Sequence, residues 1–201
     1  IKQSIADWQS FFEQHSNTKD LFQGPPTLDA EPDKSRYQII ENAWLSILDG
    51  SPFPTELFDE TGKQIAKVGN EFGATTGRPR RCGWLDLKAL ETIVFINSVS
   101  NLCLTKLDVL DELDEVKLGV AYKINGQRLE PGQMPSTLED LYAVEVEYET
   151  MPGWKADISS CRTFDELPEE AKNYVSRIEE LVGCPVSFIG VGAGREDMAV
   201  P

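Results

Sequence analysis

Residues 70–86 read Asn-Glu-Phe-Gly-Ala-Thr-Thr-Gly-Arg-Pro-Arg-Arg-Cys-Gly-Trp-Leu-Asp and form the most distinctive stretch of the chain. Three arginines fall within four positions of a protein whose formal net charge is −15: Arg78, Arg80 and Arg81. Like charges this close repel one another, so the cluster favours an anionic partner, which arginine binds through paired N–H donors. The preceding Thr75, Thr76 and Gly77 can add hydroxyl and backbone donors. This arginine loop (residues 70–86) is interpreted as a binding loop, with a solvated basic turn as the alternative.

The composition indicates a globular protein with a sizeable core. At 201 residues, 40% of them hydrophobic, the chain suits one large domain or a domain with an appendage. The acidic excess, 34 Asp plus Glu against 19 Lys plus Arg, argues against a nucleic-acid partner. No apolar run approaches the roughly 18 residues of a membrane span, and no signal segment is recognised. A cytoplasmic location without a membrane partner is therefore expected.

Cysteine and histidine usage limits the chemistry. The four cysteines are widely separated and form no C-x-x-C pair, which predicts free thiols. The only histidine, His15, has no cysteine near it in sequence, so no zinc site is predicted. Nucleophilic catalysis through histidine is excluded unless another chain supplies that residue.

Hydrophobic periodicity predicts a mixed α and β class. Helices are expected over residues 4–15, 37–48, 56–67, 87–99 and 167–183. Thr55 and Asp86 are the expected N-caps of the third and fourth of these helices, and Gly62 is expected to interrupt the third. Strands are expected over residues 102–105, 116–124, 127–129, 141–148 and 185–189. The pair Asn125-Gly126 predicts a hairpin turn.

Two short constellations follow expected strands. Lys106-Leu107-Asp108 places a carboxylate where it could accept the N1–H and exocyclic amine of guanine, with the lysine stem along the base. A surface turn is the alternative, because Lys-x-Asp triplets are common. Gly190-Val191-Gly192 could let the backbone pass close to a base or ribose, although glycines after a strand usually only make a turn. The acidic run Asp108, Asp111, Glu112, Asp114 and Glu115 is interpreted as a solvated face rather than a metal site.

Four segments together resemble the C-terminal half of adenylosuccinate synthetase: residues 52–56, 69–86, 104–111 and 148–154. The helix and tail over residues 167–198 are also similar. The resemblance covers about residues 49–200, which leaves residues 1–48 as a helical extension whose origin the sequence does not indicate.

The resemblance implies the fold of that half and a role in a GTP-dependent ligase. Such an enzyme joins IMP and L-aspartate to form adenylosuccinate in purine biosynthesis, through a 6-phosphoryl-IMP intermediate. Carried over by position, the aspartate and IMP subsite comprises Thr75, Thr76, Gly77 and Arg78. The GTP subsite comprises Arg80, Lys106, Leu107, Asp108, Gly190, Val191 and Gly192. The family is homodimeric, which implies a homodimer or association with a full-length synthetase.

The same family places its phosphate loop, catalytic aspartate, magnesium ligands and catalytic histidine in its N-terminal half. No G-x-x-x-x-G-K-[ST] is present in these 201 residues, and His15 has no matching motif. The Mg²⁺ ligands are therefore expected outside this chain, and the chain alone is expected not to turn over. Two other hypotheses stay open: a catalytically incompetent module that binds GTP or a dicarboxylate, and a scaffold remnant in which residues 1–48 cover apolar surface.

Overall fold

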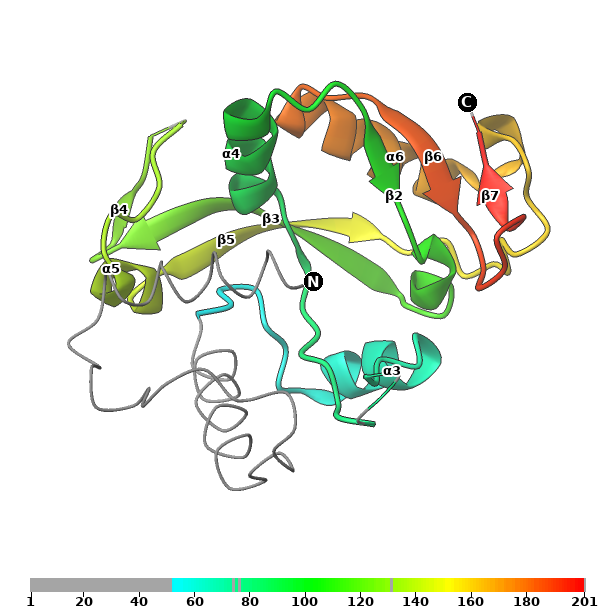
Figure 1. Ribbon diagram of the computed structural model, residues 1–201, viewed down its shortest axis with the longest axis horizontal. Coiled ribbons are helices and arrows are strands. Elements are labelled where there is room, and N and C mark those ends of the chain that lie inside the picture. Colours follow the sequence, from blue (N-terminus) through cyan, green and yellow to red (C-terminus); the bar gives the residue numbers. More distant parts are fainter. Residues whose placement is uncertain (1–51, 74, 76, 131, 201) are drawn as a thin grey trace, which may run out of the picture. The chain divides into compact units, whose positions relative to one another are not determined.

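A computed structural model describes residues 52–73, 75, 77–130 and 132–200 (Figure 1). The helices expected over residues 4–15 and 37–48, together with His15, lie outside these residues. In the described part, strands and helices alternate and form two sheets, which confirms the mixed α and β class.

The larger sheet is built around β3 (Glu115–Ile124). Strand β5 (Glu145–Pro152) pairs antiparallel with β3 along almost its whole length. Short β1 (Leu85–Asp86) pairs parallel with it, and β4 (Gln127–Arg128) antiparallel. The turn between β3 and β4 has positive φ at Asn125 and Gly126, 53° and 75°, as a tight hairpin requires. The hairpin predicted from this dipeptide is confirmed.

The smaller sheet has the order β2-β6-β7. Strand β2 (Leu102–Leu104) runs parallel to β6 (Val186–Gly190), which pairs antiparallel with β7 (Met198–Ala199). The strands expected over residues 102–105 and 185–189 are confirmed, whereas β7 was not predicted. Because β2 and β6 are parallel, the segments that follow them leave from the same edge of the sheet.

Two helices carry the caps that the sequence predicted. Helix α4 (Leu87–Asn97) begins where the Asp86 carboxylate accepts the Ala89 N–H at 3.0 Å, and it packs against β3 and α6. Helix α6 (Glu169–Val182) follows Pro168 and ends at Gly183, whose φ of 69° is left-handed. Its inner face joins the core through Ala171, Tyr174, Val175 and Ile178.

The helix expected over residues 56–67 is shorter than predicted. Helix α3 (Glu60–Val68) is capped by Asp59, whose carboxylate accepts the Gly62 N–H at 2.9 Å. Thr55 is not a cap: it is completely buried, and its carbonyl accepts the Trp84 N–H. Gly62 does not interrupt the helix but lies in its first turn, where a Cβ would lie 2.6 Å from the Leu57 carbonyl oxygen.

The strand expected over residues 141–148 begins later. Thr137 caps a short helix, α5 (Leu138–Tyr142), and β5 starts only at Glu145. Thr137 accepts the Asp140 N–H at 3.0 Å, so a local cap overrides the start of the alternating pattern. Two 3-10 turns complete the described elements, η1 (Leu107–Leu110) and η2 (Phe164–Glu166).

Candidate functional site

The segments that follow β2 and β6 touch at the carboxyl edge of the smaller sheet. Gly190 ends β6 directly against the segment after β2: a Cβ on this glycine would lie 3.2 Å from Thr105 Cα and 3.3 Å from the Lys106 nitrogen. Ligands of α/β sheets bind outside the carboxyl ends of parallel strands. The structure therefore brings together the two constellations that the sequence singled out, Lys106–Asp108 and Gly190–Gly192. We call this region the base edge.

Asp108 lies in η1 (Leu107–Leu110), and one of its carboxylate oxygens, Oδ1, is buried without a hydrogen-bond partner among the described residues. Burial raises the pKa of Asp108, and the charges of Asp197 and Asp157 add to the rise, whereas Lys106 opposes it. A buried acceptor that lacks a donor costs about 1–3 kcal/mol. A ligand N–H would relieve that cost, so Asp108 is the strongest indication of a binding site.

Leu107 and Val191 contribute to this edge only through their main chains. Their side chains are 2% and 0% exposed and belong to the core. Lys106 is different: its side chain is 46% exposed, and its Nζ donates to the Gly69 carbonyl oxygen at 2.7 Å and to the Glu71 carboxylate. The residue has a left-handed backbone with φ of 61°, an uncommon conformation for a lysine.

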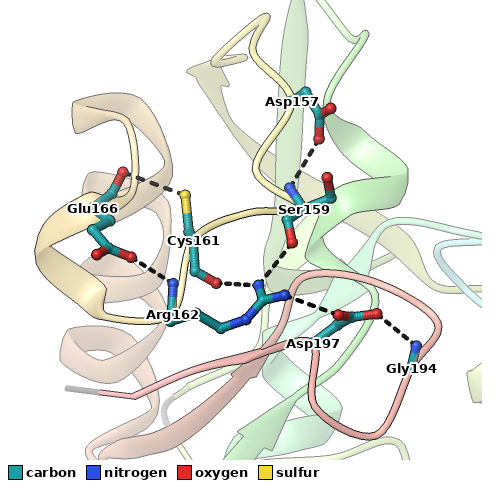
Figure 2. A network of polar contacts seen from close by, with 7 residues as sticks. All are labelled: Asp157, Ser159, Cys161, Arg162, Glu166, Gly194 and Asp197. Atoms are coloured by element: carbon teal, nitrogen blue, oxygen red, sulfur yellow. Dashed lines mark hydrogen bonds and ion pairs between the residues drawn. The ribbon is translucent and has the colours of Figure 1, made fainter.

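The glycine loop, residues 190–197, is closed by Asp197 (Figure 2). The Asp197 Oδ2 atom accepts the Gly194 N–H at 2.8 Å, and the Asp197 carbonyl accepts the Val191 N–H at 2.9 Å. A Cβ on Gly192 would lie 2.8 Å from the Asp197 Oδ2 atom, so only glycine fits at this position. The conformation of the loop is therefore fixed by hydrogen bonds to Asp197.

Arg162 fastens this loop to the preceding segment, as Figure 2 shows. Its Nη2 lies 3.1 Å from Asp197 Oδ1, and its Nη1 donates to the carbonyl oxygens of Ser159 and Cys161, both at 2.8 Å. The backbone N–H of Arg162 donates in turn to Glu166 Oε2 at 2.6 Å. Hydrogen bonds from the backbone N–H groups of Arg162 and Thr163 lower the pKa of Glu166. The base edge is thus cross-linked on one side by a chain of charged groups.

The arginine loop contains a narrow hairpin. Its arms are joined by hydrogen bonds from the Gly73 N–H to the Arg78 carbonyl at 2.8 Å and from the Arg80 N–H to the Glu71 carbonyl at 2.9 Å. Gly77 turns the tip with φ of 66°. Of the predicted aspartate-binding residues, Thr75 is exposed at this tip, and Thr76 lies outside the described residues.

Arg80 and Arg81 are paired with carboxylates of this chain. Arg80 Nη1 lies 3.1 Å from Glu71 Oε2, and Arg81 Nη2 lies 2.5 Å from Glu56 Oε2. The Arg81 guanidinium also stands 5.3 Å from the centre of the Phe53 ring. The carboxylates of Glu71 and Glu56 therefore relieve part of the charge repulsion within the cluster. The sequence interpretation did not identify these two partners.

A cavity of about 380 Å³ opens between the arginine loop and the segment after β2. Its walls are mostly apolar, with Glu71, Arg81 and Lys106 as the charged members. Asp108 does not line it. The cavity and the Asp108 carboxylate are therefore treated as separate features.

Four functional candidates escaped the sequence interpretation: Glu71, Asp111, Arg162 and Asp197. The assignment of Asp111 to a solvated acidic face is wrong, because its carboxylate accepts the Trp154 Nε1–H at 2.6 Å and the Ile158 N–H at 3.2 Å. Burial raises the pKa of Asp111. Asp111 and Trp154 both belong to segments that resemble the family, residues 104–111 and 148–154, and this was the signal that could have found the pair.

Other site types find no support in the part of the chain that is described. No group of three or more His, Cys, Asp or Glu side chains there could hold a metal ion, so these residues offer no metal site made of protein ligands alone. All four cysteines are free thiols, as predicted. Within the same residues, no helix is long and apolar enough to cross a membrane.

Known proteins resemble this chain in both sequence and fold. The family model for adenylosuccinate synthetase matches residues 29–199. The chain belongs to the adenylosuccinate synthetase family. The match begins earlier than the resemblance drawn at about residue 49, so residues 29–48 also align with the family.

Comparison with individual proteins supports this family membership. Adenylosuccinate synthetase of Paramecium tetraurelia is 55% identical over 157 residues, which cover 78% of this chain and 36% of the relative. The chloroplastic enzyme of Zea mays is 55% identical over 158 residues, 78% of this chain and 32% of the relative. Because that relative is chloroplastic, the cytoplasmic location expected for this chain stays a prediction.

The fold comparison points the same way. The structure of fully ligated adenylosuccinate synthetase from Plasmodium falciparum matches with a TM-score of 0.73 and 46% sequence identity, over 75% of this chain and 36% of the other. The chain thus spans about a third of the length of the family members that it matches.

Proposed function

We propose that this chain carries the guanine and aspartate subsites of a GTP-dependent ligase that joins IMP and L-aspartate to form adenylosuccinate. The proposal rests on family membership and on one observation, the buried Asp108 oxygen that has no hydrogen-bond partner among the described residues. The family supplies the names of the ligands, and the geometry of the base edge supplies the reason to assign them here.

Guanine fits the chemistry of Asp108. An ionised carboxylate is an acceptor only, and guanine offers two parallel donors, N1–H and the exocyclic amine. Adenine presents a lone pair at N1 instead, which would face the carboxylate unfavourably. Lys106 stands two residues away with an exposed stem that could lie along the base. Gly190 lets the backbone approach the segment after β2, and Gly192 makes room for the Asp197 side chain. The exposed guanidinium of Arg80 is assigned to the nucleotide by the family resemblance.

The hairpin tip suits a small dicarboxylate. Thr75, Thr76, Gly77 and Arg78 combine hydroxyl, backbone and guanidinium donors, which are the groups that bind the two carboxylates of L-aspartate. Arg78 would also stand near IMP. The reaction has two steps: the γ-phosphoryl group of GTP is transferred to O6 of IMP, and the aspartate amine then displaces phosphate at C6. Mg²⁺ would neutralise phosphate charge in the first step. The role proposed for the described residues is to bind and orient substrates.

Calorimetry with GTP, ITP and ATP tests the guanine subsite directly. The 201-residue chain should prefer GTP to ITP, which lacks the exocyclic amine, and prefer both to ATP. Asp108→Asn should lower the preference for GTP by about 10- to 100-fold, since hydrogen bonds to a charged group contribute about 1.5–3 kcal/mol each. Asp165→Asn at an exposed aspartate is the matched control. Equal binding of GTP and ATP by the wild-type chain would refute the guanine assignment.

A turnover assay separates a subsite module from a complete enzyme. The chain mixed with IMP, GTP, Mg²⁺ and L-aspartate should form no adenylosuccinate, because the phosphate loop and metal ligands of the family are not recognisable in its sequence. Addition of a full-length family member, with size measured by light scattering, tests association in a homodimer-like arrangement. Turnover by the chain alone would show that these 201 residues suffice.

A further inference from the structure

A single carboxylate joins the arginine loop to the base edge. Glu71 lies in the first arm of the hairpin, and its Oε2 atom is 3.1 Å from Arg80 Nη1. Its Oε1 atom accepts a hydrogen bond from Lys106 Nζ, which comes from the segment after β2. The Glu71 side chain is only 17% exposed, whereas Arg80 and Lys106 are 57% and 46% exposed. The anion is therefore enclosed and its two cations face outward.

Lys106 depends on this contact for its position. Its left-handed backbone, with φ of 61°, is a conformation that costs a non-glycine residue about 1–3 kcal/mol. The Lys106 ammonium is held by the carbonyl of Gly69 at 2.7 Å and by Glu71, both from the segment that enters the hairpin. The strained residue is thus tied to the arginine loop by its side chain and to η1 by its backbone.

Arg80 is tied to Glu71 twice. Its backbone N–H donates to the Glu71 carbonyl at 2.9 Å, and its guanidinium pairs with the Glu71 carboxylate. Because Lys106 lowers the pKa of Glu71, with a smaller contribution from Arg80, the carboxylate stays ionised near neutral pH. One charged group consequently links the base of the hairpin to Lys106, two residues before Asp108.

We propose that Glu71 is a positioning residue that couples the arginine loop to the base edge, so that ordering one subsite orders the other. This inference takes the identity of the two ligands, L-aspartate and GTP, from the proposed function, but the coupling itself is a property of the unliganded chain. Glu71 touches no substrate in this scheme; it acts through Arg80 and Lys106.

Amide hydrogen exchange of the unliganded chain tests the coupling without any ligand. Glu71→Gln should speed exchange at the Gly73 and Arg80 amides, which close the hairpin, by roughly fivefold, the effect of losing one partly buried ion pair. Lys106→Met should produce the same acceleration, although it lies 35 residues from Glu71 in sequence. The double variant should exchange no faster than either single variant.

A control variant and a second substitution at the same contact make the exchange measurements decisive. Glu60→Gln removes an exposed glutamate paired with Lys63 and should leave the hairpin amides unchanged. Since Lys106 is half-exposed, Lys106→Met keeps the test valid if Glu71→Gln fails to fold. Additive effects of the two substitutions, or a Lys106→Met chain whose hairpin amides exchange as in wild type, would overturn the proposal.

Ligand binding then separates this inference from the proposed function. In the wild-type chain, L-aspartate should tighten GTP binding by about three- to fivefold, and Glu71→Gln should abolish that enhancement. A wild-type chain that binds neither ligand contradicts the proposed function and leaves the exchange result to decide the role of Glu71. Tighter GTP binding by Glu71→Gln would instead identify Glu71 as a competing anion and reject the positioning role.

Discussion

The base edge and the arginine loop are candidate subsites of one site, and they are built in opposite ways. At the base edge, backbones meet at van der Waals distance, Leu107 and Val191 are core residues, and Arg162 cross-links the glycine loop through Asp197. The arginine loop projects as a hairpin whose tip residue Thr75 is exposed.

The two proposed ligands make different demands on the regions assigned to them. Discrimination between guanine and adenine depends on two donors aligned with one carboxylate, which requires a fixed acceptor. Capture of a small dicarboxylate depends on charge and on exclusion of water, which a hairpin can provide by closing over its ligand. We therefore expect substitutions at the base edge to change stability strongly and substitutions in the hairpin to change it weakly.

The largest effect is expected at the support of the base edge. Asp111→Ala removes the acceptor of two buried donors, Trp154 Nε1–H and the Ile158 N–H, and should lower the free energy of unfolding by about 2–4 kcal/mol. Arg80→Ala, at the foot of the hairpin, should lower it by less than about 1 kcal/mol. Urea denaturation measures the free energy of unfolding of both variants. Equal losses of stability would contradict the proposed difference between the base edge and the hairpin.

Glycine substitutions sharpen the contrast at the level of the backbone. Gly192→Ala forces a Cβ to 2.8 Å from the Asp197 side chain and should cost about 2–3 kcal/mol in stability. In Gly77→Ala the added Cβ has no atom within 4 Å. The variant should lose only about 1 kcal/mol of stability, because an alanine is strained at the left-handed φ of 66°. Thermal unfolding of both variants provides the comparison, and the reverse order would refute it.

Removal of the buried charge should stabilise the unliganded base edge. Asp108→Asn removes the negative charge of a carboxylate whose Oδ1 atom has no hydrogen-bond partner among the described residues, and it should raise the free energy of unfolding by about 1 kcal/mol at pH 7. The same variant should lose guanine preference, so stability and binding change in opposite directions. Destabilisation by Asp108→Asn, measured beside Asp165→Asn, would contradict the view that Asp108 is held at a cost.

Acid should affect the two regions with opposite signs. The pKa of Glu71 is lowered in the folded chain, so its stabilisation is present above the ordinary value of 4.5 and is lost as pH falls through the lowered pKa. The pKa of Asp108 is raised, so protonation at falling pH relieves its burial and favours the fold. Glu71→Gln should therefore lie below wild type by less than about 1 kcal/mol at pH 6 and converge with it at low pH. A constant difference down to the acid transition would contradict the assignment.

The sequence predicted the elements that local signals determine. Asp86 capped α4, Gly183 ended α6, and Asn125-Gly126 turned the hairpin, because each signal acts within a few residues. The start of α3 was missed for a tertiary reason. Thr55 is drawn into the interior beside Gly83, whose Cβ would lie 2.4 Å from the Thr55 carbonyl oxygen, and so it cannot cap a helix.

The candidate site shows the same division. Lys106, Asp108 and Gly190 could be chosen because each follows a recognisable strand, and the structure places them at one edge. The residues that hold them in place could not be predicted from the sequence. Glu71 contacts Lys106 across a separation of 35 residues, and Asp111 contacts Trp154 across 43. A charged side chain in a sequence carries no mark of the distant group that it will contact, so pairing of this kind is visible only after folding.

The Trp154 indole has a practical consequence for spectroscopy. It is held by Asp111, three residues beyond Asp108, and its ring centre lies 6.0 Å from that of Tyr174 at an interplanar angle of 54°. A shift of η1 on nucleotide binding would change the polarity around this indole and its quenching by the tyrosine. Intrinsic fluorescence would then report occupancy of the base edge without a label, and a Trp154→Phe chain would identify the signal.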